Sequence, residues 1–260
     1  MELEGKVAMV TGGGRGLGRA TALALAELGA KVVVIARTLP EVEETTRLIR
    51  QQYGIGRSMA IRADISRERD VVTAFDTVRK RWDHVDILIN NAGDTGATKS
   101  IISLSMEDWQ HAIDVNLNGV FLCSREALRD MVRNHWGRIV NVSSGSAAVA
   151  VPDIAPYSVA KAAVEHLTHL IAAECASSGV VAVALRPGLL DTRMQEEVRT
   201  RPTEQIPPGL RAIYAAYKQK GMLMAPERAA SIIAYLCTNR AGEINGRVLD
   251  AAEMDALLVR

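Results

Sequence analysis

The chain has 260 residues, of which 48% are hydrophobic and 23% charged, a composition typical of soluble globular proteins. Lysine and arginine number 31 against 30 aspartates and glutamates, a balance that argues against a protein binding nucleic acid through phosphate neutralisation. Three scattered cysteines, no signal-peptide pattern and no apolar run of membrane-spanning length exclude a disulfide framework and predict a cytoplasmic protein without membrane association.

Short β-branched runs alternate with longer helical patterns from the beginning of the chain to its end. In chain order we predict a strand at 6–11, a helix at 16–28, a strand at 31–36, a helix from about 40 to 54, a strand at 58–63, a helix N-capped by Ser66 and ending near 82, a strand at 86–90, a helical stretch at 105–134, a strand at 138–142, a helix at 155–177, a strand at 180–185, an irregular segment at 187–224, a helix at 226–237 and an edge strand at 247–250. Apolar strands separated by helices indicate a parallel sheet covered on both faces. The pattern therefore predicts a three-layer, doubly wound α/β sheet, the Rossmann fold, with residues 1–260 forming one domain.

A glycine-rich loop follows the first predicted strand and leads into the first predicted helix. It reads Thr11-Gly12-Gly13-Gly14-Arg15-Gly16-Leu17-Gly18, with the spacing Thr-Gly-x-x-x-Gly-x-Gly in place of the literal Gly-x-Gly-x-x-Gly. Glycines permit a tight turn and let a pyrophosphate approach the helix N-terminus, where amide groups and the helix dipole favour an anion. An ordinary glycine-rich turn is the alternative, and the strand–loop–helix context favours a dinucleotide site.

The residues after the second predicted strand bear on which dinucleotide binds. An acidic side chain there would accept from the ribose 2′-hydroxyl of NAD, whereas an arginine would pair with the 2′-phosphate of NADP. Here the strand is followed by Arg37 and Thr38, with no acid before Glu41, and Arg15 approaches from the glycine loop. We therefore expect NADP(H) to be preferred over NAD(H); a solvated surface arginine is the alternative.

A serine, a tyrosine and a lysine form the candidate catalytic group. Ser144 follows the fifth predicted strand, and Tyr157 and Lys161 share one face of the next helix because they are four residues apart. A Lys161 ammonium about 4 Å away would lower the pKa of Tyr157 from its ordinary value near 10, which suits general acid–base catalysis. Ser144 can donate to a carbonyl oxygen that gains negative charge. A lone Tyr-x-x-x-Lys would be an ordinary surface pair, but this one follows a strand-end serine.

With these motifs in order, the chain resembles the shorter, single-domain branch of the short-chain dehydrogenase/reductase family. The resemblance implies that Asn116 is a fourth catalytic residue, which supports a proton-relay water. It implies further cofactor contacts after the third, fourth and sixth strands, at Asp64, Ile65, Asn91, Ala92, Gly93, Pro187, Gly188, Leu189 and Thr192. Residues 189–224 differ between family members and would form the substrate loop.

We therefore expect an NADP(H)-dependent oxidoreductase that interconverts a small-molecule carbonyl compound and a secondary alcohol. A dinucleotide-binding sensor or scaffold without catalysis is the alternative, and an epimerase or dehydratase of the longer branch is disfavoured by the glycine spacing. The resemblance also implies a homo-oligomer, a tetramer or dimer, with the helices at 105–134 and 155–177 at one interface. His166 and His169 lie three residues apart with no evident third ligand, so no metal site is expected.

Overall fold

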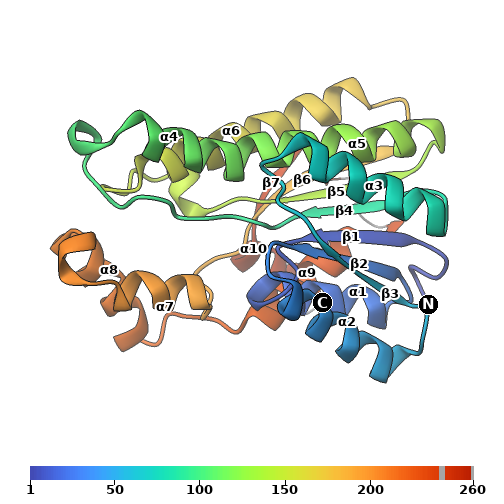
Figure 1. Cartoon of the computed structure of the whole chain (residues 1–260), viewed down its shortest axis with the longest axis horizontal. Helices are drawn as coiled ribbons and strands as arrows, with labels where there is room; N and C mark the ends of the chain where they lie inside the picture. Colours follow the sequence, from blue (N-terminus) through green and yellow to red (C-terminus); the bar gives the residue numbers. More distant parts are fainter. Residues whose placement is uncertain (240–243, 259–260) are drawn as a thin grey trace.

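Seven parallel strands form the central sheet of the computed structural model, which describes residues 1–239 and 244–258 (Figure 1). Their spatial order is β3-β2-β1-β4-β5-β6-β7, which confirms the doubly wound parallel sheet. The strands are β1 (Val7–Thr11), β2 (Lys31–Ala36), β3 (Ser58–Arg62), β4 (Ile87–Asn90), β5 (Gly137–Val142), β6 (Val180–Arg186) and β7 (Val248–Asp250). Because all the strands are parallel, their carboxyl ends and the loops that follow them lie at the same end of the sheet.

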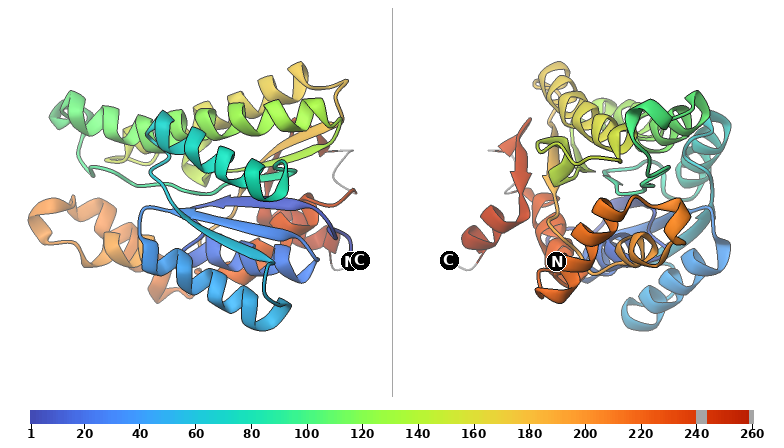
Figure 2. Two further views of the ribbon diagram at one scale, coloured as in Figure 1. Left: turned by 45° about the vertical axis from the view of Figure 1, so that its right-hand side comes forward. Right: turned by 90° about the vertical axis from the view of Figure 1, so that its left-hand side faces the viewer.

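Helices cover both faces of this sheet (Figures 1 and 2). One face carries α1, α2 and α9, and the other carries α3, α4, α5 and α6. The helices are α1 (Gly16–Glu27), α2 (Leu39–Tyr53), α3 (Glu68–Trp82), α4 (Met106–Ile113), α5 (Gly119–Arg133), α6 (Ala155–Glu174), α7 (Arg193–Thr200), α8 (Pro208–Gln219), α9 (Pro226–Leu236) and α10 (Ala251–Leu258). None of these described helices is long and apolar enough to cross a membrane.

The strands bury side chains on both faces, which is why they read as continuous apolar runs. In β1, Val10 packs toward α1, α2 and α9, whereas its neighbour Met9 packs toward α3, α5 and α6. The register aligns Val10 with Val34 of β2 and with Ile89 of β4, so apolar side chains form rows across each face. Burial on both faces fixes this register and hence the height at which each strand ends.

Two predicted helix boundaries were wrong. Ser66 is not the N-cap of α3, because its hydroxyl donates to Asp64 Oδ1 at 2.7 Å and Arg67 occupies the cap position. The stretch at 105–134 is divided into α4 and α5 by a π-helical segment, Asp114–Asn118. Such wider turns insert an extra residue and often occur at functional sites.

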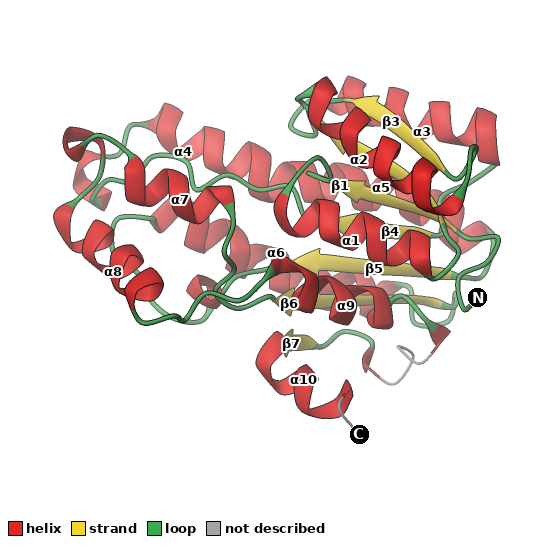
Figure 3. Cartoon of the chain, turned by 90° about the horizontal axis from the view of Figure 1, so that it is seen from below, coloured by secondary structure: helices red, strands yellow, loops and turns green. Residues whose placement is uncertain are grey.

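The segment expected to be irregular contains two helices, α7 and α8. They project beyond the carboxyl ends of the strands (Figure 3), where Leu210 of α8 is buried together with Val198 of α7 and Ile154. Pro207 and Pro208 obscured α8 in the sequence, yet Pro208 occupies the first helical turn, where a missing N–H costs nothing. α10, which follows β7, was not predicted either.

Candidate active site

A cavity of about 580 Å³ opens beyond the carboxyl ends of the strands. It is lined by nearly all the residues that the sequence nominated: Gly12, Gly14, Arg15, Gly16, Leu17, Gly18, Arg37, Thr38, Asp64, Ile65, Asn91, Ala92, Gly93, Ser144, Tyr157, Lys161, Pro187, Gly188, Leu189 and Thr192. The two exceptions are Thr11 and Asn116, which are buried behind its wall. Segments far apart in sequence therefore meet in one site.

The glycine loop is packed so closely that side chains would not fit. A Cβ on Gly18 would lie 2.3 Å from the carbonyl oxygen of Gly12, and a Cβ on Gly12 would lie 2.9 Å from Ala92 Cα. Gly12 also has φ +62°, in the region that favours glycine. The loop thus forms a cradle against the N-terminus of α1, a suitable shape for a pyrophosphate.

Thr11 supports this cradle from beneath. Its hydroxyl donates to the carbonyl oxygen of Ile89 at 3.2 Å and accepts from the backbone amides of Asn91 and Ala92 at 3.0 and 3.1 Å. The Asn91 side chain donates in return to the carbonyl oxygens of Thr11 and Gly12 at 2.9 and 3.2 Å. These bonds fasten the ends of β1 and β4 together, so Thr11 positions the loop from a buried place.

Arginine and carboxylate side chains line the part of the cavity near the ends of β2 and β3. Arg37 is exposed, and its charge helps hold the pKa of Asp64 low: burial raises that pKa, but hydrogen bonds from Ser66 and the arginine outweigh the burial. Arg15, expected beside Arg37, forms an ion pair with Glu197 of α7 at 3.2 Å. Glu41, which no sequence motif placed in the site, also lines the cavity.

The candidate catalytic group lies where β5 ends and α6 begins. Lys161 is buried, and its Nζ donates to the carbonyl oxygen of Val142 at 2.8 Å. Its Nζ lies 5.7 Å from the centre of the Tyr157 ring, and Ser144, which lines the same cavity, acts to lower the pKa of Tyr157. The helix therefore brings the three side chains together as the spacing predicted.

The expected lowering of the tyrosine pKa is contradicted by the structure. Burial raises the pKa of Tyr157 to about 12, although the hydrogen bond with Ser144 acts to lower it. Burial likewise lowers the pKa of Lys161 to about 8. The expectation was wrong because the cost of burying a phenolate exceeds the stabilisation that its neighbours supply here.

Asn116 occupies the π-helical segment between α4 and α5. Its side-chain amide donates to the carbonyl oxygens of Asp94 and Ala112 at 2.8 and 2.9 Å, and its oxygen accepts from the Asp94 backbone amide at 3.1 Å. A Cβ on Gly93 would lie 3.0 Å from Asn116 Oδ1 and 3.6 Å from Lys161 Nζ. Asn116 and Lys161 therefore both lie close to Gly93, and a side chain there would press on both.

The other end of the cavity carries residues that no motif singled out. Tyr214 and Tyr217 of α8 line it, with ring centres 5.9 Å apart, together with Gln195 of α7. Tyr214 belongs to an apolar stripe with Leu210 on α8, and this helical spacing was the available signal. The structure thus makes this end mainly apolar and uncharged.

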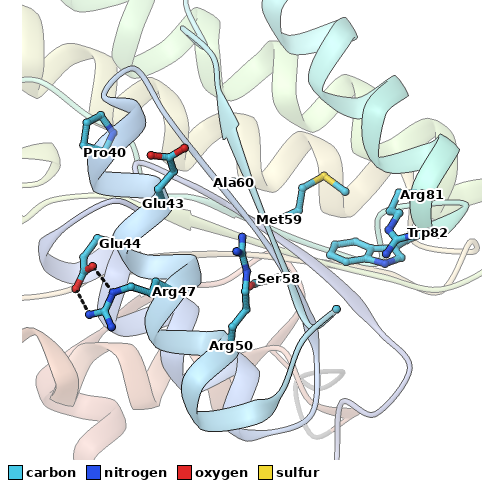
Figure 4. A pocket seen from close by; sticks show the side chains of 11 residues that line it. Pro40, Glu43, Glu44, Arg47, Arg50, Ser58, Met59, Ala60, Arg81 and Trp82 are labelled. Atoms are coloured by element: carbon cyan, nitrogen blue, oxygen red, sulfur yellow. Dashed lines mark hydrogen bonds and ion pairs between the residues drawn. The ribbon is translucent and has the colours of Figure 1, made fainter.

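A second hollow lies at the outer edge of the sheet, between α2 and β3 (Figure 4). Glu44 and Arg47 point along its rim and pair with each other through two hydrogen bonds of 2.7 Å. It is open and lies at the β3 edge, away from the ends of the strands where the glycine loop and Tyr157 meet, so we do not consider it the active site.

Comparison with known proteins identifies the family of this chain. The short chain dehydrogenase family matches residues 6–203. The 3-oxoacyl-(acyl-carrier-protein) reductase FabG of Aquifex aeolicus is 33% identical over 96% of each chain, and the cis-4-hydroxycyclohexanecarboxylate dehydrogenase of Sinomonas cyclohexanicum is 35% identical over 94% of each. The crystal structure of a protein described as a gluconate dehydrogenase, from Agrobacterium tumefaciens, has a TM-score of 0.85 at 31% identity, covering 96% of this chain and 95% of the other. The chain therefore belongs to the short-chain dehydrogenase family and is an NAD(P)-dependent oxidoreductase.

Proposed function

We propose that this protein interconverts a small carbonyl compound and a secondary alcohol, with NADP(H) as the preferred cofactor. The observation that carries the proposal is the meeting of Ser144, Tyr157 and Lys161 in the wall of a cavity whose opposite end is the glycine cradle. No other described part of the chain combines an acid–base group with such a cradle. The catalytic residues are Ser144, Tyr157, Lys161 and Asn116.

The residues present fit a dinucleotide. The glycine loop packs too closely against its own neighbours to carry side chains, and it lines the cavity at the N-terminus of α1, where a pyrophosphate would lie. Gly93 after β4 and Gly188 after β6 line the same cavity as Tyr157. Arg37 and Thr38 would hold the adenosine end, and Arg37 supplies the cation that a 2′-phosphate requires. When bound, the nicotinamide would supply or accept the hydride.

Around the substrate, each residue would have a separate task. Tyr157, with a pKa near 12, is protonated at neutral pH and would donate that proton to the carbonyl oxygen. Ser144 would stabilise the same oxygen with a hydrogen bond as negative charge develops. Lys161 would return a proton to Tyr157 from solvent through a relay water, which Asn116 would support.

The substrate end supports an uncharged reacting group of moderate size. Its lining is mostly apolar, with hydroxyl groups from Tyr214 and Tyr217. The relatives include a reductase named for an acyl-carrier-protein substrate and a dehydrogenase named for a hydroxycyclohexane carboxylate, which share the carbonyl–alcohol pair. We infer that this pair, and not one particular substrate, is what the site recognises.

The organisation of the chain completes the proposal. We propose one catalytic domain over residues 1–260, with residues 189–224 closing the substrate end, in a cytoplasmic homo-oligomer. Exposed apolar side chains on the neighbouring helices α5 and α6 support the assembly, because apolar side chains gathered on one surface are typical of protein contacts: Phe121, Val132, Val159 and Leu170.

The first experiment is oxidation of NADPH and NADH measured in parallel over a panel of carbonyl compounds, with Tyr157→Phe as the matched variant. We expect turnover with NADPH, and a loss of about 10²–10⁴-fold in kcat in the variant, since general acid catalysis supplies a factor of that size. Cofactor affinity should stay within about three-fold, because the phenol ring remains. Turnover that survives in a folded Tyr157→Phe protein would contradict the mechanism, and cofactor binding without any turnover would favour a sensor.

A further inference from the structure

Helix α6 places three polar side chains in one row, at Tyr157, Lys161 and Glu165. The first two belong to the proposed catalytic group. Lys161 Nζ donates to the carbonyl oxygen of Val142 at 2.8 Å, and one turn later Glu165 Oε1 accepts from Ser143 Oγ at 2.6 Å. Successive turns of α6 thus hold successive residues at the end of β5.

The Glu165 carboxylate also binds the end of β6. Arg186 donates from Nε and Nη2 to its two oxygens, both at 2.8 Å, in a bidentate pair. Arg186 is the last residue of β6, directly before Pro187 and Gly188, which line the cavity. Such paired, charge-assisted bonds fix orientation as well as distance.

This carboxylate is ionised at neutral pH. Burial raises the pKa of Glu165, but the hydrogen bonds from Arg186 and Ser143 outweigh it and hold the pKa below its ordinary value. The Glu165 side chain is only 12% exposed, so water offers few competing partners. A third link runs from Arg186 to Asp250 of β7, whose carboxylate lies 3.6 Å away. One buried anion thus ties α6 to two strand ends.

We propose that Glu165 and Arg186 are positioning residues for hydride transfer. The pair fixes the strand end that carries Ser144, and the loop at 187–188 beside the nicotinamide position, to the helix that carries Tyr157. This inference rests on the proposed function. It goes further by assigning the relative placement of the proton donor and the hydride carrier to a single ion pair outside the Ser-Tyr-Lys-Asn group.

The alternative is an ion pair that serves stability alone, and the chain offers a matched control. Glu126 of α5 is a fully buried carboxylate that pairs with Arg129 at 2.9 Å and Arg79 at 3.4 Å, on the face of the sheet away from the glycine cradle. Glu165→Gln and Glu126→Gln therefore remove the same charge from similar surroundings. A stabilising role predicts the same phenotype for both variants.

The experiment compares Glu165→Gln, Arg186→Lys and Ser143→Ala with Glu126→Gln. For each variant we would measure the unfolding temperature, kcat and KM for the carbonyl substrate, the primary deuterium isotope effect with NADPH labelled at C4, and the emission of bound NADPH. A misplaced reacting group costs up to about 10²-fold in rate. We expect Glu165→Gln to lower kcat at least about ten-fold with a small change in KM, and to raise the isotope effect as hydride transfer becomes rate-limiting.

The companion variants refine this result. Arg186→Lys should lie between wild type and Glu165→Gln, because it keeps the charge and loses the bidentate geometry. Glu126→Gln should lower the unfolding temperature without changing kcat or the isotope effect. The emission of bound NADPH should fall in Glu165→Gln, since a loosely held nicotinamide is quenched by water.

An unchanged kcat, isotope effect and emission in folded Glu165→Gln would overturn the proposal. If that variant does not fold, Arg186→Lys, which keeps the charge and loses the bidentate geometry, is measured in its place, and unchanged values there would overturn the proposal equally. Failure of the proposed function is distinct, because wild type itself would then be inactive on the panel. In that case the emission of bound NADPH still tests the positioning role.

Discussion

At the scale of single residues, burial governs the charges of the proposed catalytic pair, Tyr157 and Lys161. Lys161 and Tyr157 both have pKa values displaced toward their neutral forms, to about 8 and about 12. A buried group resists ionisation because the protein interior solvates charge poorly. The site therefore holds a neutral phenol ready to donate and a lysine that titrates near neutral pH, which suits a proton relay better than a permanently charged ammonium.

Replacement of Lys161 by methionine should stabilise the fold and abolish activity. The folded-state pKa of about 8 lies below the ordinary 10.5, so the unfolded chain binds more protons between these values and stability rises with pH across that window. Below about pH 8 the full cost of the buried ammonium is present. We expect Lys161→Met to unfold about 2–4 °C above wild type at pH 7, with the gap closing toward pH 10, in thermal melts followed by circular dichroism. A gap that widens with pH would contradict the assignment.

Arg37 should set the cofactor preference. Changing it to aspartate removes a cation and supplies the acid that a ribose 2′-hydroxyl prefers. We expect the affinity for NADPH to fall by about 10-fold or more and that for NADH to rise, because charge-assisted bonds to phosphate contribute about 1.5–3 kcal/mol. Fluorescence titration with both cofactors measures these affinities. The control is Arg67→Asp, which makes the same charge change at an exposed arginine directly before α3. An equal loss of affinity for NADPH and NADH would show that Arg37 does not bind the 2′-phosphate specifically.

At the scale of elements, an ion pair joins α7 to the glycine loop. Glu197 of α7 accepts from Arg15 at 3.2 Å and from Arg193 at 2.9 Å, and Arg193 lies 3.6 Å from Glu41 of α2. These groups are largely exposed, so each pair contributes little to stability. Glu197 would therefore compete with a cofactor phosphate for Arg15, because the same guanidinium cannot pair fully with both anions.

Glu197→Gln should therefore tighten the binding of NADPH. Release of Arg15 from an exposed pair offers at most about 1 kcal/mol, or about five-fold in affinity. NADH, which lacks the 2′-phosphate, should bind as in wild type, and the gain should shrink in high salt. Calorimetric titrations of the two cofactors at low and high salt measure both effects. An equal gain for NADH would instead indicate a general opening of α7.

The π-helical segment Asp114–Asn118 illustrates how an element is shaped by its site. A regular helix would run through this position, but the wider turn places Asn116 where it bonds the Asp94 backbone in both directions. Those bonds fix the loop after β4, and with it Gly93, which lies close to both Asn116 and Lys161. The departure from regular geometry thus serves the arrangement of the catalytic group.

At the scale of the whole molecule, α5 and α6 lie side by side on one face and leave apolar side chains on their surface (Figure 1). Phe121 of α5 is 46% exposed, as is Leu170 of α6. We expect Phe121→Asp to shift the proposed homo-oligomer toward smaller species in light scattering, because a buried carboxylate at an interface is costly. Ile55→Asp is the control, since Ile55 lies in the α2–β3 turn and is 96% exposed. A monomeric wild type at working concentration would refute the assembly.

Much of this fold was determined by the sequence alone. The β-branched runs marked the strands nearly to the residue, because burial on both faces of a parallel sheet demands continuous apolar segments. The common location of the glycine loop, Ser144, Tyr157 and Lys161 in one cavity could be predicted because it follows from local spacing: a tight turn before a helix, and two side chains four residues apart. Such local relations can be recognised in the amino-acid sequence because they involve residues close together in the chain.

Only the tertiary structure decided the remaining features. The pKa of Tyr157 depends on how completely the surrounding elements exclude water, and no spacing reports that. The helical form of α7 and α8 depends on packing against Ile154, and the pairing of Arg15 with Glu197 joins residues 182 positions apart. The Glu165–Arg186 pair likewise forms because α6 packs against β6 in the folded chain. These properties arise from burial and long-range contact, which exist only once the chain has folded.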